Sequence, residues 1–171
     1  ILQVIPFSAI PDRIFYCISY AVFAVPLMLF YAFFIPPFQV PDESSHFARA
    51  YQLTQGEFFP TKQPDPDAPG EYTVGGTTDP GIYLAAGKLT YLQFNSAKKY
   101  SINKAVEVNR YTWRDGEMRD TRSVSVNAPT FYAIPALGVV LGQYLDKSIV
   151  QTLTLSRLIN GCLAFVVSCI A

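Results

Sequence analysis

The stretch that decides the fold is IFYCISYAVFAVPLMLFYAFFIPPFQVP, from Ile14 to Pro41, which contains no charged side chain. It exceeds the roughly 20 apolar residues that a helix needs to cross a bilayer. Pro26 lies mid-run, where a membrane helix tolerates a proline as a kink, and Pro36 and Pro37 predict where the helix ends. A cleaved signal peptide would have a shorter apolar region followed by small residues. We therefore expect a transmembrane helix here.

Charged residues are segregated along the chain. Of its 13 basic and 13 acidic side chains, 21 lie between Asp42 and Arg122. One soluble globule does not usually sort its charges in this way, whereas a membrane chain with one large water-facing loop does. The neutral balance also argues against a nucleic-acid partner, because phosphate contact needs a basic excess on some face.

Two further apolar runs follow this charged segment. The first, PTFYAIPALGVVLGQYL, begins at Pro129, and its Gly138 and Gly142 have the G-x-x-x-G spacing that lets neighbouring membrane helices approach closely. The second begins at Leu158 and is still apolar at Ala171. Because of that ending and the missing initiator Met, we expect the chain to be a fragment of a protein with more spans.

The runs predict an all-α integral membrane protein, a transmembrane helix bundle fragment with a large first external loop. Basic residues beside short loops favour the cytoplasmic side, so Arg13, Lys147 and Arg157 are expected there, with Arg157 extended to that surface. The expected segments are a cytoplasmic N-terminal segment (1–13), a first transmembrane helix (14–38), an external, periplasmic or extracellular loop (39–128), a second transmembrane helix (129–145), a cytoplasmic turn (146–157) and the start of a third transmembrane helix (158–171).

The external loop opens with PDESSHFARAYQLTQG, residues 41–56. Proline and acidic residues suit a helix N-terminus, and apolar residues recur at helical spacing up to Gly56. This pattern predicts a juxtamembrane amphipathic helix that lies at the membrane surface. The Pro- and Gly-rich segment 56–81 is expected to be loop, the segment 82–100 one helix, and the segment 123–126 a short strand.

The candidate chemistry is at the start of the loop. Asp42 and Glu43 are adjacent carboxylates, and Asp42 shares a helix face with His46, the one histidine of the chain. They could form a general base or a metal-binding carboxylate site next to lipid, or they could cap the helix as a solvated pair. The sequence is not HExxH, and it contains no G-x-S-x-G elbow, Walker loop or paired Cys/His ligand set.

The string PPFQVPDESSHFARAYQLTQGE, directly after the first apolar run, resembles the start of the bacterial multi-pass proteins grouped as domain of unknown function 2142. The P-x-D-E-x-x-H-(F/Y)-x-R-A motif of that family is carried here by Pro41, Asp42, Glu43, His46, Phe47, Arg49 and Ala50. The strings NAPTFYAIPALGVVLG and LSRLINGCLAFVV are similar to its second span and the start of its third. Ser44 stands where family members often have proline.

By architecture the family resembles C-type glycosyltransferases, which use polyprenyl-phosphate sugars and hold a catalytic acid just past the first helix. This resemblance implies a membrane enzyme of the bacterial plasma membrane that moves a sugar to a surface-glycan acceptor. Asp42 would activate the acceptor hydroxyl, Glu43 would assist or hold a divalent cation, and His46 and Arg49 would bind donor phosphate. The alternative is a non-catalytic transporter or scaffold component of surface polysaccharide assembly. The sequence identifies neither the sugar nor the acceptor.

Overall fold

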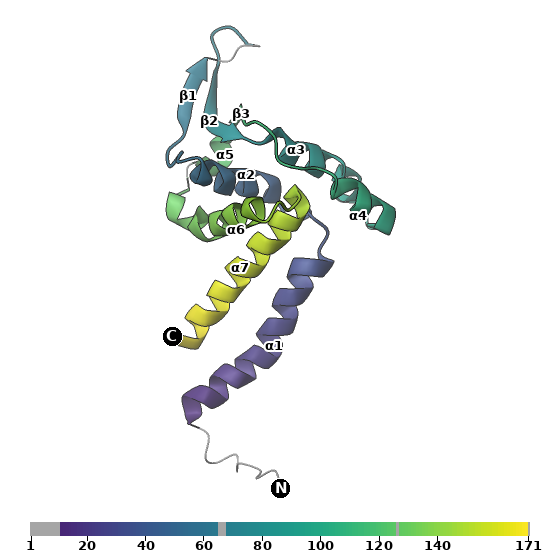
Figure 1. Ribbon diagram of the computed structural model, residues 1–171, viewed down its shortest axis with the longest axis vertical. Coiled ribbons are helices and arrows are strands. Elements are labelled where there is room, and N and C mark those ends of the chain that lie inside the picture. Colours follow the sequence, from purple (N-terminus) through teal and green to yellow (C-terminus); the bar gives the residue numbers. More distant parts are fainter. Residues whose placement is uncertain (1–10, 65–67, 126, 171) are drawn as a thin grey trace.

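The computed structural model describes residues 11–64, 68–125 and 127–170; of the expected N-terminal segment, residues 1–10 lie outside this range. Figure 1 shows two long helices side by side, with a lobe of shorter elements at one end. In chain order the elements are α1 (Asp12–Phe34), α2 (Glu43–Thr54), β1 (Thr61–Pro64), β2 (Tyr72–Thr78), α3 (Pro80–Gly87), η2 (Thr90–Leu92), α4 (Ile102–Val108), β3 (Glu117–Asp120), α5 (Arg122–Ser125), η3 (Pro129–Tyr132), α6 (Ala133–Tyr144) and α7 (Ile149–Ile170).

The two long helices, α1 and α7, are antiparallel neighbours. Tyr20 of α1 stacks on Phe165 of α7 with ring centroids 5.7 Å apart, and Cys17 Sγ donates to the carbonyl oxygen of Cys169 at 3.4 Å. Within the described residues, the helices long and apolar enough to cross a membrane are these two, over Ile14–Phe34 and Ile149–Ile170. α1 ends at Phe34, just before the two consecutive prolines.

The structure differs from the expected second span at 129–145. That segment forms the single turn η3 and then α6, whose 12 residues make a helix of about 18 Å, short of the roughly 30 Å of a bilayer core. α6 crosses beneath α2 in Figure 1 instead of running parallel to α1. The second long apolar helix is α7, which begins at Ile149 and not at Leu158.

The segment 146–157, expected as a cytoplasmic turn, contacts the loop from which a membrane was expected to separate it. Trp113 Nε1 donates to the carbonyl of Lys147 at 3.1 Å, and the Ile149 amide donates to the carbonyl of Tyr111 at 3.0 Å. Ser148 Oγ accepts from the Gln151 amide at 3.2 Å, which satisfies one of the free N–H groups at the start of α7. Residues 149–157 of the expected turn therefore form the first turns of α7, and only 146–148 lie outside the helix.

The two glycines of the G-x-x-x-G spacing lie where α6 crosses α7, and the close approach predicted for them is confirmed. A Cβ added at Gly138 would lie 2.5 Å from Ser156 Cα, and one added at Gly142 would lie 2.7 Å from Thr152 Cβ. Both distances are below van der Waals contact, so a side chain at either position would force the two helices apart.

α2 forms over the residues expected, but its position differs from a helix lying on a membrane surface. Six consecutive residues, Phe47 to Gln52, are buried, so the helix is covered around its circumference. It contacts the sheet on one side and α6 on the other, as Figure 1 shows. α2 is therefore the central helix of the lobe.

The Pro- and Gly-rich segment expected as loop contains two strands. β1 and β2 are antiparallel, with Thr61 opposite Gly75, and β2 pairs in turn with β3, with Gly75 opposite Asp120. Gly75 permits this pairing because an added Cβ would lie 2.7 Å from the Thr121 amide. Cross-strand pairing between segments about 45 residues apart in sequence decides the structure here, and local composition does not report it.

Two other local expectations also differ from the structure. The segment 82–100, expected as one helix, contains the end of α3 and the single turn η2. α3 begins at Pro80, and Asp79 Oδ1 caps it by accepting from the Gly81 amide at 2.7 Å. The short strand expected over 123–126 is the helical turn α5, with Val126 outside the described residues.

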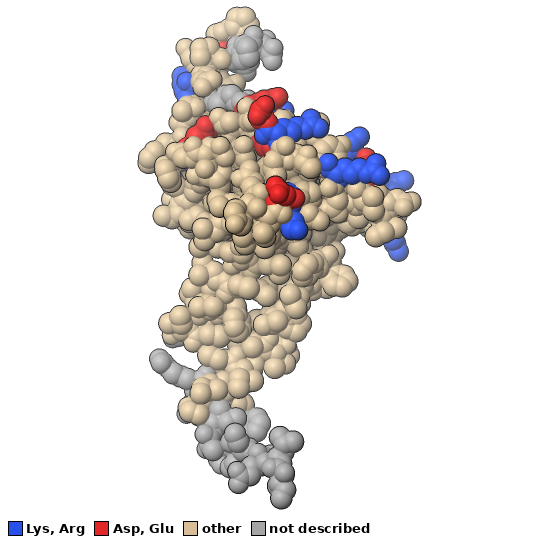
Figure 2. All heavy atoms as spheres, in the orientation of Figure 1, with Lys and Arg blue, Asp and Glu red and all other residues tan. Residues whose placement is uncertain are grey.

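Charge and exposure divide the molecule into two parts. Figure 2 shows the Lys, Arg, Asp and Glu side chains on the lobe, while the described part of the two long helices is free of them on this face. Large apolar side chains such as Phe23, Phe34 and Val167 are more than half exposed on α1 and α7. Such surfaces suit hydrocarbon, and the lobe suits water.

Candidate functional site

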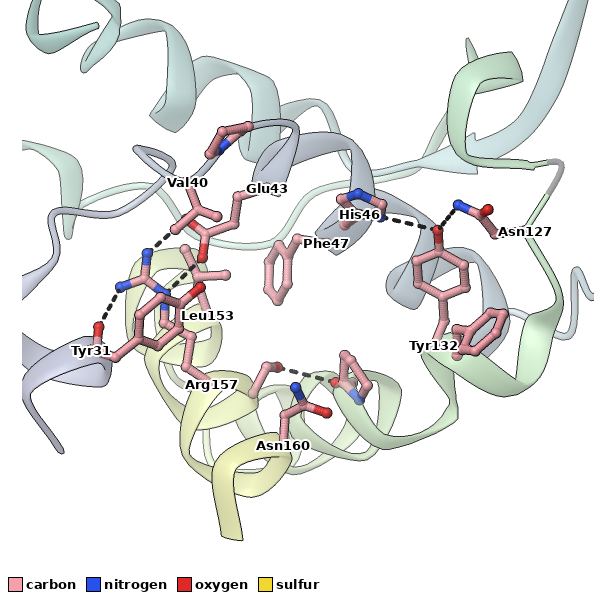
Figure 3. A pocket seen from close by; sticks show the side chains of 14 residues that line it. Tyr31, Val40, Glu43, His46, Phe47, Asn127, Tyr132, Leu153, Arg157 and Asn160 are labelled. Carbon is pink, nitrogen blue, oxygen red and sulfur yellow. Dashed lines mark hydrogen bonds and ion pairs between the residues drawn. The ribbon is translucent and has the colours of Figure 1, made fainter. Parts of the chain in front are cut away.

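A pocket of about 440 Å³ lies where the lobe meets the long helices, among the end of α1, α2, α6 and α7 (Figure 3). We call it the central pocket. Phe47, Pro135 and Leu153 contribute to its apolar wall, and polar side chains lie at its two ends. An apolar cavity with a few placed polar groups is the usual form of a small-molecule site.

At one end, Arg157 of α7 and Glu43 of α2 form a two-pronged ion pair. Arg157 Nε donates to Glu43 Oε1 and Arg157 Nη2 donates to Glu43 Oε2, each over 2.7 Å. The two side chains are 5% and 10% exposed. Arg157 Nη1 donates to the carbonyl of Ile35 at 2.8 Å, and the Phe38 amide donates to Glu43 Oε2 at 2.8 Å. Every nitrogen of the Arg157 guanidinium thus has a partner.

The end of α1 explains why an arginine is placed here. The last carbonyls of a helix have no intrahelical partner, and the next residues, Pro36 and Pro37, have no N–H to offer. Arg157 supplies the missing donors, and its charge suits the negative end of the helix. The expectation that Arg157 reaches the cytoplasmic surface is therefore wrong, because its guanidinium lies against α1 and the first residue of α2.

At the other end, a neutral hydrogen-bond network surrounds the Tyr132 hydroxyl. His46 Nδ1 lies 3.0 Å from this hydroxyl, Asn127 Nδ2 donates to it at 2.9 Å, and the Val124 carbonyl lies 3.4 Å away. The direction of the hydrogen bond between His46 and Tyr132 depends on the histidine tautomer. In the tautomer that accepts from Tyr132 at Nδ1, Nε2 carries the histidine hydrogen and is a donor that faces no partner among the described residues.

Asp42 lies outside the central pocket, although it adjoins Glu43. It precedes α2 with a left-handed backbone (φ 56°), its side chain makes no capping hydrogen bond, and it is exposed. It lines a second hollow of about 870 Å³, between the end of α1 and the segment 92–100. Gln93, Asn95 and Lys98 give this hollow a polar wall, and we call it the polar groove.

A third hollow of about 440 Å³, the lipid-side crevice, lies between α1 and α7, with Met28 and Phe165 in its walls. It shares Tyr31, Arg157 and Asn160 with the central pocket. The central pocket in turn shares Val40, Pro41 and Glu43 with the polar groove. The three hollows therefore adjoin one another in series through shared wall residues, from the crevice between α1 and α7, by way of the central pocket, to the polar groove of the lobe.

Arg49 does not line any of these three hollows. It is 1% exposed, and its guanidinium donates to the carbonyls of Glu57 and Phe58 at 3.0 and 2.6 Å and to Gln52 Oε1 at 2.9 Å. Burial lowers the pKa of this guanidinium because it disfavours the charged form. Arg49 thus holds the chain after α2 in place, away from the pocket.

The structure offers little for a metal ion. Among the residues it describes, no three His, Cys, Asp or Glu side chains lie close enough to hold one. Both oxygens of Glu43 are engaged by Arg157. A divalent cation held by Glu43, which the sequence left as one possibility, would have to displace that arginine.

The family assignment now has direct support. The family model described as predicted membrane protein (DUF2142) matches residues 26–171. The chain belongs to this family. Comparison with curated proteins and with solved structures returns no match. The chain is therefore a membrane protein of a family whose function is not defined, and the bilayer is its one established partner.

The structure thus separates the four residues singled out in the sequence. Glu43 and His46 line the central pocket at opposite ends, Asp42 lies in the polar groove, and Arg49 is in the core. Sequence reasoning missed Tyr132 and Asn127 as partners of His46, and it missed Arg157 as the partner of Glu43. Arg157 did carry a signal, since it is the one charged residue between Lys147 and Ala171, and such a charge calls for a partner.

Proposed function

We propose that this chain is the donor-binding part of a multi-pass membrane glycosyltransferase, which moves a sugar from a polyprenyl-phosphate carrier to a cell-surface glycan. The observation that carries the proposal is the series of three hollows described above. A lipid-linked sugar has a tail that stays in hydrocarbon and a polar end that must reach water. A path from an apolar crevice, past buried charges, to a polar groove matches those two requirements.

In this proposal the carrier's tail lies in the lipid-side crevice, its phosphate in the central pocket and its sugar in the polar groove. Asp42 takes the proton of the acceptor hydroxyl. The acceptor oxygen forms a bond to the anomeric carbon of the sugar while the bond from that carbon to the phosphate oxygen breaks. The polyprenyl phosphate leaves with the electron pair of that bond.

Asp42 suits the role of base better than Glu43. The Asp42 carboxylate is exposed in the groove, whereas Glu43 is bound to Arg157. His46 can donate from Nε2 to a phosphate oxygen in the central pocket. A direct phosphate contact from Arg49 would require the chain at Glu57 and Phe58 to open, so Arg49 enters this proposal as a positioning residue.

We also propose that the chain crosses the membrane twice, through α1 and α7. The lobe, 35–148, then lies on one side of the membrane. Within the lobe, α6 runs parallel to the membrane plane on the side that faces the membrane. Arg13, at the far end of α1, favours the cytoplasm for that end, which places the lobe outside the plasma membrane, where surface glycans are assembled. Lys147 and Arg157, at or near the lobe end of α7, no longer contribute to this orientation.

The proposal is tested with the complete protein, purified with its native lipids. Sugar release is measured from a panel of polyprenyl-phosphate sugars, for wild type, Asp42→Asn and the control Glu71→Gln, which alters an exposed acid in the hairpin. We expect turnover in wild type and the control, and a loss of about 10²–10⁴-fold in Asp42→Asn. Donor binding without turnover, unchanged by Asp42→Asn, would instead favour the transporter or scaffold function.

A further inference from the structure

We propose that Arg157 is the ligand of the carrier's phosphate, and that Glu43 occupies the place of that phosphate until the carrier binds. The inference rests on the proposed function, since it assumes a lipid phosphate in the central pocket. It adds a residue that the sequence motif does not contain, and a reason for the pairing of Glu43.

The first argument is position. Arg157 lines both the lipid-side crevice and the central pocket, while Glu43 lines both the central pocket and the polar groove. The ion pair therefore stands at both junctions of the series of hollows. A carrier that spans the three hollows would pass this pair, which Figure 3 shows at one end of the central pocket, and its phosphate would lie beside it.

The second argument is the shape of the contact. Arg157 presents two parallel N–H groups to the two oxygens of Glu43, each at 2.7 Å. A guanidinium binds carboxylate and phosphate in this same forked geometry. A phosphate with two free oxygens can therefore replace the carboxylate without a new side-chain conformation in Arg157.

The third argument is that Arg157 has a second set of contacts that the exchange leaves intact. Nη1 donates to the Ile35 carbonyl at 2.8 Å, and Nη2 lies 3.3 Å from the Pro36 carbonyl. These contacts hold the guanidinium at the end of α1 whichever anion lies on its other side. The cation is thus positioned in advance, which lowers the cost of binding.

The fourth argument concerns Glu43 after the exchange. Its Oε2 accepts from the Phe38 amide at 2.8 Å, and the residue lies in the first turn of α2, where a negative charge is stabilised. The displaced carboxylate would therefore keep one hydrogen bond and face the groove that holds Asp42. Carrier binding would then place a second free carboxylate beside the acceptor site.

A structural latch between α1, α2 and α7 is the competing explanation, and buried ion pairs often contribute little net stability. The two explanations predict opposite effects for Glu43→Gln. A latch is weakened by this change, and phosphate binding falls with it or stays unchanged. An exchange site loses its competing anion, so the variant binds phosphate more tightly than wild type.

The experiment uses the complete protein in nanodiscs and two probes, undecaprenyl phosphate and undecaprenol, which differ only in the phosphate. Binding is measured by native mass spectrometry, and thermal unfolding is recorded for every variant. We expect Glu43→Gln to bind the phosphate probe about tenfold more tightly than wild type, because the charged carboxylate no longer competes with the phosphate for Arg157. Binding of the alcohol should not change. Arg110→Gln, which removes an exposed arginine of the lobe, is the control and should match wild type.

Arg157→Gln should lose the preference for phosphate over alcohol. Because that variant leaves Glu43 unpaired and could unfold, the neutral double variant Glu43→Gln/Arg157→Gln is measured too, and it should fold and also lack the preference. Retained preference in the folded double variant, or phosphate binding by a folded Glu43→Gln that is equal to or weaker than that of wild type, would overturn the inference. If either result is found while the wild type transfers sugar, the role given to Arg157 is wrong and the proposed transferase function stands. If the wild type prefers the phosphate probe but transfers sugar from no donor, the proposed transferase function is wrong.

Discussion

The two ends of the central pocket hold their polar groups by different means. At the α1 end, Glu43 and Arg157 are both charged, and each depends on the other. At the α6 end, His46, Asn127 and Tyr132 form a neutral network around one hydroxyl. Breaking a buried ion pair costs about 3–5 kcal/mol because a lone charge remains, whereas a neutral hydrogen bond contributes about 0.5–1.5 kcal/mol. The charged end is therefore the more sensitive to substitution, and the neutral end the more adaptable.

The largest effect is expected at the charged end. Arg157→Met keeps a long apolar side chain but leaves the Glu43 carboxylate buried without its cation. We expect the free energy of unfolding to fall by about 3–5 kcal/mol, measured by denaturant unfolding of the complete protein in detergent. The double variant Glu43→Gln/Arg157→Met should recover most of this loss. Equal stability of the single and double variants would show that an unpaired Glu43 carboxylate costs nothing, and that the charged end is not the more sensitive one.

The next effect concerns the part of the central pocket's wall where α6 crosses α7. Gly138→Val places a side chain against Ser156, whose hydroxyl donates to the Pro135 carbonyl at 3.1 Å in the pocket wall. Overpacking of this kind costs about 1–3 kcal/mol. Gly87→Val is the matched control, since nothing lies within 4 Å of a Cβ at that position. Thermal unfolding of both variants measures the difference, and equal melting temperatures would argue against a close crossing.

A smaller effect is expected at the neutral end. Tyr132→Phe removes the hydroxyl that His46 and Asn127 share, at a cost of about 1 kcal/mol, and it frees the imidazole to rotate. Tyr144→Phe, an exposed tyrosine of α6 (81%), should cost nothing measurable. Unfolding free energies give the first result, and the nitrogen chemical shifts of the single histidine give the second. A loss as large as that of Arg157→Met would remove the distinction between the ends.

The smallest effect comes from Asp79, which is buried and bound by two backbone amides instead of a bidentate arginine, and so serves as a reference for Glu43. Burial raises the pKa of the Asp79 carboxyl in the folded chain above its ordinary 3.8. The folded chain then binds the proton more readily than the unfolded chain. The Asp79 carboxyl therefore makes the free energy of unfolding fall as pH rises from about 3.8 to the folded pKa. Above that pH its contribution no longer changes.

Asp79→Asn should remove this contribution, so the difference between the variant and wild type should change with pH only inside that window. Unfolding free energies measured from pH 3.5 to 7.5 test the expectation. A constant offset across the range would mean that the carboxyl titrates alike in both states. The lost acceptor for the Arg114 amide would then account for the whole effect.

Much of the membrane character was predictable from sequence, since α1 from Ile14 onward lies in a 28-residue stretch without charge, and the G-x-x-x-G spacing marked a real helix crossing. The second long helix was misplaced because Ser148 to Arg157 carries enough polar side chains to be mistaken for a turn. Those polar groups are satisfied by the lobe and by α1, through contacts distant in sequence such as Ser148 to Asn109. Local hydropathy does not contain that information.

The site was predictable in part for the same reason. The motif located Glu43 and His46 at the boundary between α1 and the lobe, which is where the central pocket lies. It could not show that Arg157, 114 residues further on, holds Glu43, or that Tyr132 holds His46. Pairs on one helix follow from spacing, whereas pairs between α2, α6 and α7 follow only from the fold.

Because α6 is short, the number of membrane crossings is even if α1 and α7 are the ones that cross. Three crossings would leave the two ends of the segment 12–170 in different compartments, whereas crossings by α1 and α7 alone return the chain to the compartment from which it came. A reporter enzyme inserted before Asp12 and one inserted after Ile170 would then respond alike, and one placed in the hairpin between β1 and β2 would respond oppositely. The lobe would be an insertion between two halves of a helical hairpin, able to vary in sequence without altering the sidedness of whatever the chain is joined to.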